Sequence, residues 1–148
     1  MDNRGNVLSP AVLAAVNVHD TCLLPESIRG LTALTKQLGI DLYGSFATFD
    51  PAFYSNRNHQ VIEASGMLPV IKPNHRNTKD PRVIAEREAV FADVRSIYHL
   101  RFTGERNFAW EDKYRRLVVR YERKQTNARG WRDLAAALVN FRWCFRET

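Results

Sequence analysis

Residues 42–71 read LYGSFATFDPAFYSNRNHQVIEASGMLPVI and contain the clearest indication of tertiary structure in the chain. Their first part, residues 42–49, is rich in aromatic and small side chains and has no helical period. It runs directly into Asp50 and Pro51, a pair typical of a turn. The pattern predicts a buried strand with Asp50 at its carboxyl end.

The second part of this stretch completes a β-α-β unit. Polar residues beginning at Ser55 can cap a short helix that continues through Ala64. Gly66 then precedes a compact apolar strand at residues 67–71. Because a crossover helix normally returns the chain in the same direction, we expect the two strands to be parallel. The fold class is therefore α/β.

Two apolar segments lie before this unit. Residues 7–16 contain Ser9 and Pro10 within an apolar run, which is compatible with a strand or a hairpin arm. Residues 23–38 have leucine and isoleucine at spacings of three and four, which predicts an amphipathic helix closed by Gly39.

The region after the unit reads as a loop followed by helices. Residues 72–81 hold two prolines and three cationic side chains, which predicts a mobile basic loop able to touch phosphate. Residues 83–113 have helical spacing and predict one long helix or two joined near Gly104. A final helix is expected at residues 131–145, with one apolar stripe made by Trp131, Leu134, Ala135, Leu138 and Phe145.

Length and charge set the class of protein and the kind of partner. A chain of 148 residues, 45% of them hydrophobic, is long enough for one domain with a core, so we treat residues 1–148 as a single domain. The formal charge is +6, and residues 101–148 carry all of it, with twelve Arg or Lys against six Asp or Glu. A basic C-terminal third favours a polyanionic partner.

Other classes of protein are disfavoured. Cys22 and Cys144 are far apart and have no metal-binding cluster beside them, which indicates neither a disulfide framework nor a zinc site. The chain shows no signal peptide and no apolar run of membrane-spanning length. We expect a cytoplasmic protein with no membrane partner.

Three residues at helical spacing are the strongest candidates for chemistry. Tyr98, Arg101 and Glu105 stand at i, i+3 and i+7, on one face of the expected helix. A carboxylate directed from a helix toward Asp50 at a strand end is the arrangement that a Mg²⁺ (or Mn²⁺) site needs. Two such ions could support phosphodiester cleavage.

Structural alternatives exist for Glu105 and Asp50, and a further aspartate, Asp20, has a structural interpretation. Glu105 could form an i,i+4 ion pair with Arg101, although arginine before glutamate is the less favourable order. Asp50 before Pro51 could serve as a turn or helix-cap aspartate. Asp20 beside His19 is interpreted as a loop-ordering pair or a helix cap, because His19 and Cys22 are only half a metal site.

The spacing Tyr98-x₂-Arg101-x₃-Glu105 resembles the signature around the third catalytic carboxylate of DDE-type bacterial insertion-sequence transposases. That family usually has a basic residue seven positions after the glutamate, and here Lys113 follows one position later. Upstream blocks are similar in the same order, namely Asn17-Val18-His19-Asp20, Thr48-Phe49-Asp50-x-x-Phe53-Tyr54-Ser55 and Gly66 to Lys72. The resemblance covers nearly the whole chain.

The resemblance implies a fold and a set of roles. The family fold is ribonuclease-H-like, a mixed sheet with flanking helices, here with a long C-terminal helical region. Asp50 and Glu105 would bind the metal, while Tyr98, Arg101 and Lys113 would have positioning roles. The family's first aspartate lies on a strand upstream of every matched block, so we expect an N-terminally truncated domain. Whether Asp2 can replace that aspartate stays open.

The basic C-terminal third suggests a DNA-tracking surface. Its cations alternate with aromatic residues, and the alternative is an ordinary solvated helix face. The candidate DNA contacts are Arg115, Arg116, Arg120, Arg123 and Lys124. No motif that reads base edges is visible.

The resemblance implies DNA transposition, by metal-dependent cleavage and strand transfer at insertion-sequence ends. With one carboxylate missing, we expect this polypeptide to be inactive alone. The expected partners are DNA and a second copy or an intact transposase. The alternatives are a non-catalytic DNA-binding regulator and an inert remnant of a transposase gene.

Overall fold

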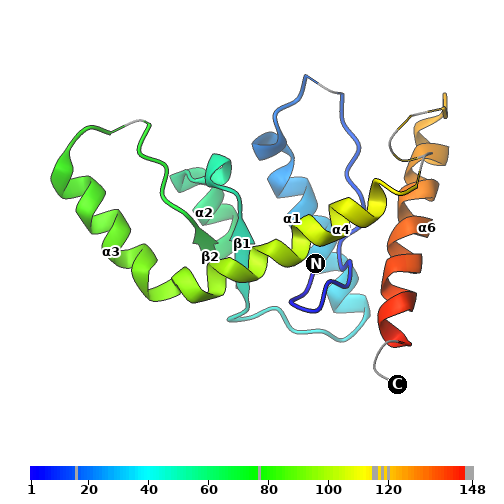
Figure 1. The fold of residues 1–148 in the computed structure, drawn as a ribbon, viewed down its shortest axis with the longest axis horizontal. Coiled ribbons are helices and arrows are strands. Elements are labelled where there is room, and N and C mark those ends of the chain that lie inside the picture. The colour runs from blue at the N-terminus through cyan, green and yellow to red at the C-terminus, as the bar shows by residue number, and fades with distance from the viewer. Residues whose placement is uncertain (16, 77, 115–116, 118, 120, 146–148) are drawn as a thin grey trace.

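The computed structural model describes residues 1–15, 17–76, 78–114, 117, 119 and 121–145. A small sheet lies near the middle of the molecule, α3 forms one edge, and α6 stands at the other (Figure 1). The elements in chain order are α1 (Asp20–Gln37), β1 (Phe46–Phe49), the 3₁₀ helix η1 (Pro51–Phe53), α2 (Asn56–Glu63), β2 (Leu68–Ile71), α3 (Pro81–Tyr98), the 3₁₀ helix η2 (His99–Arg101), α4 (Phe102–Glu111) and α6 (Gln125–Cys144).

The β-α-β unit is confirmed. β1 and β2 pair in parallel, with Phe46 opposite Leu68 and Phe49 opposite Ile71. α2 connects them and begins after Ser55, whose side chain accepts a hydrogen bond from the Asn58 amide at 3.2 Å. Within the described ranges the sheet has these two strands, so the chain is an α/β domain with a small parallel sheet rather than the mixed sheet that we expected.

The core lies where α1 and α2 meet one face of the sheet. Its buried residues are Leu24, Ile28, Ile62, Met67 and Ile71. Side chains alternate along a strand, so Val70 belongs to the other face, which α3 covers and near which Phe91 is buried. Burial on both faces explains why the sequence of β2 is continuously apolar.

α1 confirms the amphipathic helix and its glycine stop. The amide of Gly39 donates to the Lys36 carbonyl and that of Ile40 to the Thr35 carbonyl, which is the Schellman arrangement, and Gly39 has φ +69°. The helix begins three residues earlier than expected. His19, not Asp20, caps it, by accepting from the Thr21 amide at 3.3 Å.

The prediction of a strand at residues 7–16 is wrong for the described part, residues 7–15, which has no regular secondary structure and pairs with neither described strand. The Val7 amide donates to Asn140 Oδ1 at 2.7 Å, and Asn140 Nδ2 donates to the Val7 carbonyl at 3.0 Å. An α6 side chain thus satisfies the backbone groups that a neighbouring strand would otherwise pair.

The C-terminal helices differ from expectation in their limits. The break in the long helical region falls at η2, before Gly104, where η2 packs against β1. α6 begins at Gln125 rather than Trp131, because Gly130 continues the helix instead of ending it. The expected apolar stripe also divides: Ala135 is buried with Val139, whereas the other four members face outward. None of the described helices is long and apolar enough to span a membrane.

Candidate active site

Asp50 sits at the carboxyl end of β1 and holds the following turn. Its Oδ1 accepts a hydrogen bond from the Ala52 amide at 3.0 Å and so caps η1. Behind it, the Phe49 and Phe53 rings pack with centroids 5.3 Å apart, and Asn58 Nδ2 donates to the Phe53 carbonyl at 2.8 Å. The expected cap role is therefore present, and it leaves Oδ2 of Asp50 for other partners.

Tyr98, Arg101 and Glu105 lie on one face of the helical region, as their spacing predicts. Tyr98 ends α3, Arg101 ends η2, and Glu105 is in the first turn of α4. Arg101 Nη2 is 2.9 Å from Glu105 Oε1. The Arg101 guanidinium also lies 5.6 Å from the Tyr98 ring centroid and 5.8 Å from that of Phe102. The ion pair that we considered as the structural alternative for Glu105 is present.

Arg101 also reaches the other carboxylate. Its Nη1 is 3.8 Å from Asp50 Oδ2, so one guanidinium joins the strand end to α4. All three charged groups retain solvent exposure, and pairs of this kind contribute at most about 1 kcal/mol each. These contacts serve mainly to bring two carboxylates from distant parts of the sequence to the same cation.

The environment of Tyr98 reflects this arrangement. Partial burial raises the pKa of its hydroxyl above the ordinary tyrosine value. The positive charge and hydrogen bond of Arg101 oppose that change, and the negative charges of Asp50 and Glu105 add to it. Tyr98 therefore lies close enough to sense both carboxylates, and it stays a neutral hydroxyl at physiological pH.

The donor set here suits a Mg²⁺ or Mn²⁺ ion. Two half-exposed carboxylates supply the hard oxygen ligands that these ions prefer, and Mg²⁺ commonly takes only one or two from protein and completes its shell with water. The Arg101 guanidinium is the cation between Asp50 and Glu105 in this structure. In the described part of the chain, no group of three or more His, Cys, Asp or Glu side chains is placed to hold a metal.

The remaining candidates lie on the C-terminal side. Lys113 is exposed just after α4, and Arg123 and Lys124 are exposed just before α6. The other three expected DNA contacts, Arg115, Arg116 and Arg120, lie outside the described residues.

The basic loop at residues 72–81 is attached to α3. His75 Nε2 lies 2.8 Å from Glu88 Oε1, and Asp80 caps α3. Its three cations, Lys72, Arg76 and Lys79, remain exposed.

Asp2 is engaged locally. Its carboxylate accepts hydrogen bonds from the Arg4 amide and from the amide and side chain of Asn6, at 2.7 to 2.9 Å. Burial alone would raise the pKa of Asp2, but these hydrogen bonds outweigh it and lower that pKa. Asp2 thus closes the N-terminal turn.

The contact of Arg101 with both carboxylates is the feature of the candidate site that the sequence did not reveal. The place of Arg101 between Tyr98 and Glu105 in the helical register was visible, but its approach to Asp50 was not. That approach depends on the packing of η2 against β1, which no local pattern specifies.

Comparison with known families gives one finding. The family model described as "Transposase DDE domain" matches residues 1–140. Neither the curated proteins nor the solved structures contain a match to the chain.

Proposed function

The chain belongs to the transposase DDE domain family, and on that premise we propose that Asp50 and Glu105 are two of the carboxylates of a metal-dependent DNA-cleavage site. The reaction would be cleavage and strand transfer at insertion-sequence ends. The carrying observation is that Arg101 contacts both carboxylates, one at a strand end and one on α4. Family membership supports DNA as the substrate and a divalent ion as the cofactor.

Asp50 and Glu105 would hold the ion, which would supply an activated water and stabilise the leaving oxygen of the phosphodiester. The chain's own residues would do the positioning. Arg101 restrains the Glu105 carboxylate at 2.9 Å and would shift to a phosphate oxygen when DNA is present, because guanidinium groups bind both anions in the same forked geometry. Tyr98, a neutral hydroxyl beside Arg101, would keep the guanidinium oriented. Lys113, which is exposed just after α4, would contact the DNA strand.

The α/β arrangement supports placing the unit within a ribonuclease-H-like domain. In that domain β1 and β2 would be two strands of a larger sheet. A third carboxylate would have to come from another strand or another chain, since the described residues offer no three-ligand cluster. We therefore expect this polypeptide alone to bind a divalent ion weakly and to leave DNA intact.

Mn²⁺ binding, followed by electron paramagnetic resonance of the free ion, tests the ligand assignment. Asp50→Asn and Glu105→Gln should each weaken binding, because each removes one oxygen ligand. Asp93→Asn and Glu86→Gln are matched controls, since they remove exposed carboxylates on α3 other than the two that pair with Arg101. Equal loss in all four variants would contradict a specific site.

Nicking of supercoiled plasmid tests activity directly. Without a third carboxylate we expect no nicking in Mg²⁺ or Mn²⁺. Nicking that disappears with Glu105→Ala would show instead that the third ligand is present in this polypeptide.

A non-catalytic DNA-binding regulator is the second candidate function. It is favoured by the position of Arg101, whose guanidinium contacts both carboxylates and neutralises one of their two negative charges, and by the exposed cations Arg123 and Lys124. For this function, a gel shift should weaken as salt rises and should survive Asp50→Ala. Arg123→Gln with Lys124→Gln should weaken it, whereas Arg82→Gln on α3 should change it little.

A further inference from the structure

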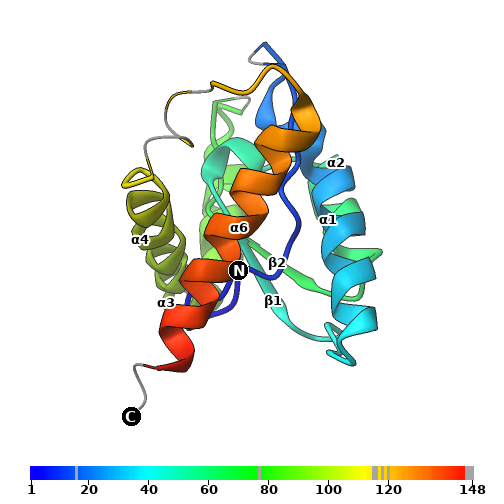
Figure 2. The same ribbon diagram turned by 90° about the vertical axis from the view of Figure 1, so that its right-hand side faces the viewer.

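Lys72 follows β2 directly, as Asp50 follows β1. The strands pair in parallel, and their last register pair is Phe49 with Ile71. Asp50 and Lys72 are the next residues along, so they leave the sheet side by side, at a strand spacing of about 4.8 Å. Figure 2 shows β1 and β2 running together through the molecule. Lys72 is therefore at the same edge of the sheet as the proposed ligand Asp50.

The side chain of Lys72 belongs to the face of the sheet on which α3 packs. Ile71 is buried in the core on the other face, and side chains alternate along a strand, so Lys72 points toward the α3 side. Asp50 is placed likewise at the end of β1, where it meets Arg101 of η2. Pro73 is buried directly after Lys72, so the backbone is held on both sides of this exposed side chain.

The charge of Lys72 is not used within the described part of the chain, where it forms no ion pair. The candidate site beside it has two carboxylates and one guanidinium, which leave one negative charge. A divalent ion would turn this into one positive charge, and a phosphodiester and the attacking hydroxide would each add a negative one. One negative charge would then remain, and an ammonium group at the sheet edge would neutralise it.

The other lysine of this loop, Lys79, is placed differently. It precedes Asp80, which caps the start of α3, whereas Arg101 lies beyond the end of that helix. A helix of 18 residues is about 27 Å long. Lys79 is therefore far from the candidate site, although it is exposed like Lys72 and lies in the same loop.

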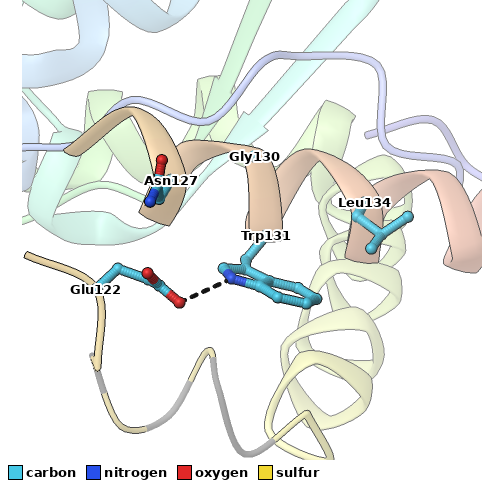
Figure 3. A pocket seen from close by; sticks show the side chains of 5 residues that line it. All are labelled: Glu122, Asn127, Gly130, Trp131 and Leu134. Atoms are coloured by element: carbon cyan, nitrogen blue, oxygen red, sulfur yellow. Dashed lines mark hydrogen bonds between the residues drawn. The ribbon is translucent and has the colours of Figure 1, made fainter. Parts of the chain in front are cut away.

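The hollow on α6 is less suited to a phosphate. Its volume is about 430 Å³, and it is lined by Glu122, Asn127, Gly130, Trp131 and Leu134 (Figure 3). The charged group in this lining is the Glu122 carboxylate, which accepts a hydrogen bond from the Trp131 indole at 3.0 Å. A carboxylate repels a phosphate, so the edge of the sheet is the better place for a phosphodiester.

We propose that Lys72 is a positioning residue that binds the phosphodiester to be cleaved, beside the ion held by Asp50 and Glu105. Its ammonium group would contact a non-bridging oxygen of the phosphate from the β2 side, while Arg101 would contact the phosphate from the η2 side. Lysine suits this role because its ammonium group is a compact charge with three donors on a flexible stem. The inference rests on the proposed cleavage site and adds to it a group that receives the substrate.

The ³¹P relaxation of a thymidine dinucleotide, which has a single phosphodiester, tests this assignment. Mn²⁺ bound to the whole chain should speed the relaxation when the dinucleotide binds beside the ion, and a titration gives the affinity. Lys72→Gln should lower that affinity about two- to fivefold, the range expected of one exposed ion pair. Lys72→Arg keeps the charge and should retain most of the affinity. Lys79→Gln, the matched control, should behave as the wild-type chain does.

The Mn²⁺ affinity without dinucleotide separates this inference from the proposed function. Lys72→Gln should bind Mn²⁺ at least as tightly as the wild-type chain, because it removes a neighbouring positive charge and no ligand. If Mn²⁺ binds but the dinucleotide affinity is the same with and without Lys72, the role of Lys72 is wrong and the metal site stands. Equal losses in Lys72→Gln and Lys79→Gln would also overturn it, since the effect would then be the general charge of the loop. A wild-type chain that binds no Mn²⁺ would overturn the proposed function and, with it, the place of Lys72 beside an ion.

Discussion

Arg101 is the central residue of the proposed site, because its guanidinium contacts the same two carboxylates that a divalent ion would bind. It is 2.9 Å from Glu105 and 3.8 Å from Asp50. Arg101→Gln removes this competing cation. We expect Mn²⁺ affinity to rise by up to about fivefold, which corresponds to the roughly 1 kcal/mol available from exposed pairs. Titration calorimetry or electron paramagnetic resonance can measure it.

Arg95→Gln is the matched control for that change. Arg95 also faces a glutamate, Glu88 at 3.9 Å, and an aromatic ring, Phe91, whereas the arginine that pairs with Asp50 is Arg101. It should leave Mn²⁺ affinity unchanged. A fall in affinity with Arg101→Gln would show that, for binding of the ion, the restraint of Glu105 by Arg101 outweighs its competition with the ion.

The ionisation of Tyr98 should make the stability of the chain depend on pH in the alkaline range. Its pKa is raised in the folded chain, chiefly by burial, so the folded state favours the neutral hydroxyl. The associated stability is present below the ordinary tyrosine value of about 10 and is lost as pH rises through the raised value. Tyr98→Phe should make the stability of the chain fall less steeply at alkaline pH.

The tyrosinate absorbance of the folded protein provides a direct measurement. Tyr98→Phe should remove the part that titrates above the ordinary value, and Tyr43→Phe, which alters an exposed ring, should leave that part in place. An unchanged titration in Tyr98→Phe would contradict the assignment.

At the scale of elements, sequence patterns predicted the helices and strands that are stabilised by interactions between residues close in sequence. The β-α-β unit and α1 were predictable because caps, glycine stops and apolar periods lie within a few residues of the elements they define. Residues 7–15 were not, because the backbone groups of Val7 are satisfied by Asn140, 133 positions away in the sequence. In the candidate site, helical spacing was enough to predict that one face carries Tyr98, Arg101 and Glu105. The approach of Arg101 to Asp50 was not predictable in this way, because it depends on packing between η2 and β1.

The turn between β1 and α2 positions Asp50, and a hydrogen bond from Asn58 stabilises this turn. Asn58 is buried, and its Nδ2 donates to the Phe53 carbonyl at 2.8 Å. Asn58→Ala leaves that carbonyl without its donor, which should cost about 1–3 kcal/mol in the free energy of unfolding. Urea denaturation can measure the loss. Mn²⁺ affinity should fall as well, since Asp50 is the N-cap of the same turn.

Asn56→Ala is the comparison for that variant. Asn56 is exposed at the start of α2, so its replacement should change the stability by less than about 0.5 kcal/mol. Similar losses in the two variants would show that the Asn58 hydrogen bond is not what holds the turn.

At the scale of the whole molecule, residues 7–15 connect α6 to the rest of the domain. On one side, Gln125 Nε2 donates to the Leu13 carbonyl at 3.2 Å, and Asn140 binds Val7. On the other, Ser9 Oγ donates to the Ser27 carbonyl of α1 at 3.4 Å. The segment runs between α1 and α6 in Figure 1, and its hydrogen bonds to both helices help to fix the orientation of α6 relative to the core.

The Asn140 pair is the stronger of these links, because one amide satisfies both backbone groups of Val7 at 2.7 and 3.0 Å. Asn140→Ala removes both hydrogen bonds and should lower the free energy of unfolding by about 1–3 kcal/mol. Asn140→Asp keeps the acceptor for the Val7 amide but loses the donor, so its loss of protection at that amide should be smaller. Hydrogen exchange can separate the two variants at Val7. If the Val7 amide exchanged equally fast in the wild-type chain and in Asn140→Ala, Asn140 would not be what holds Val7 against α6.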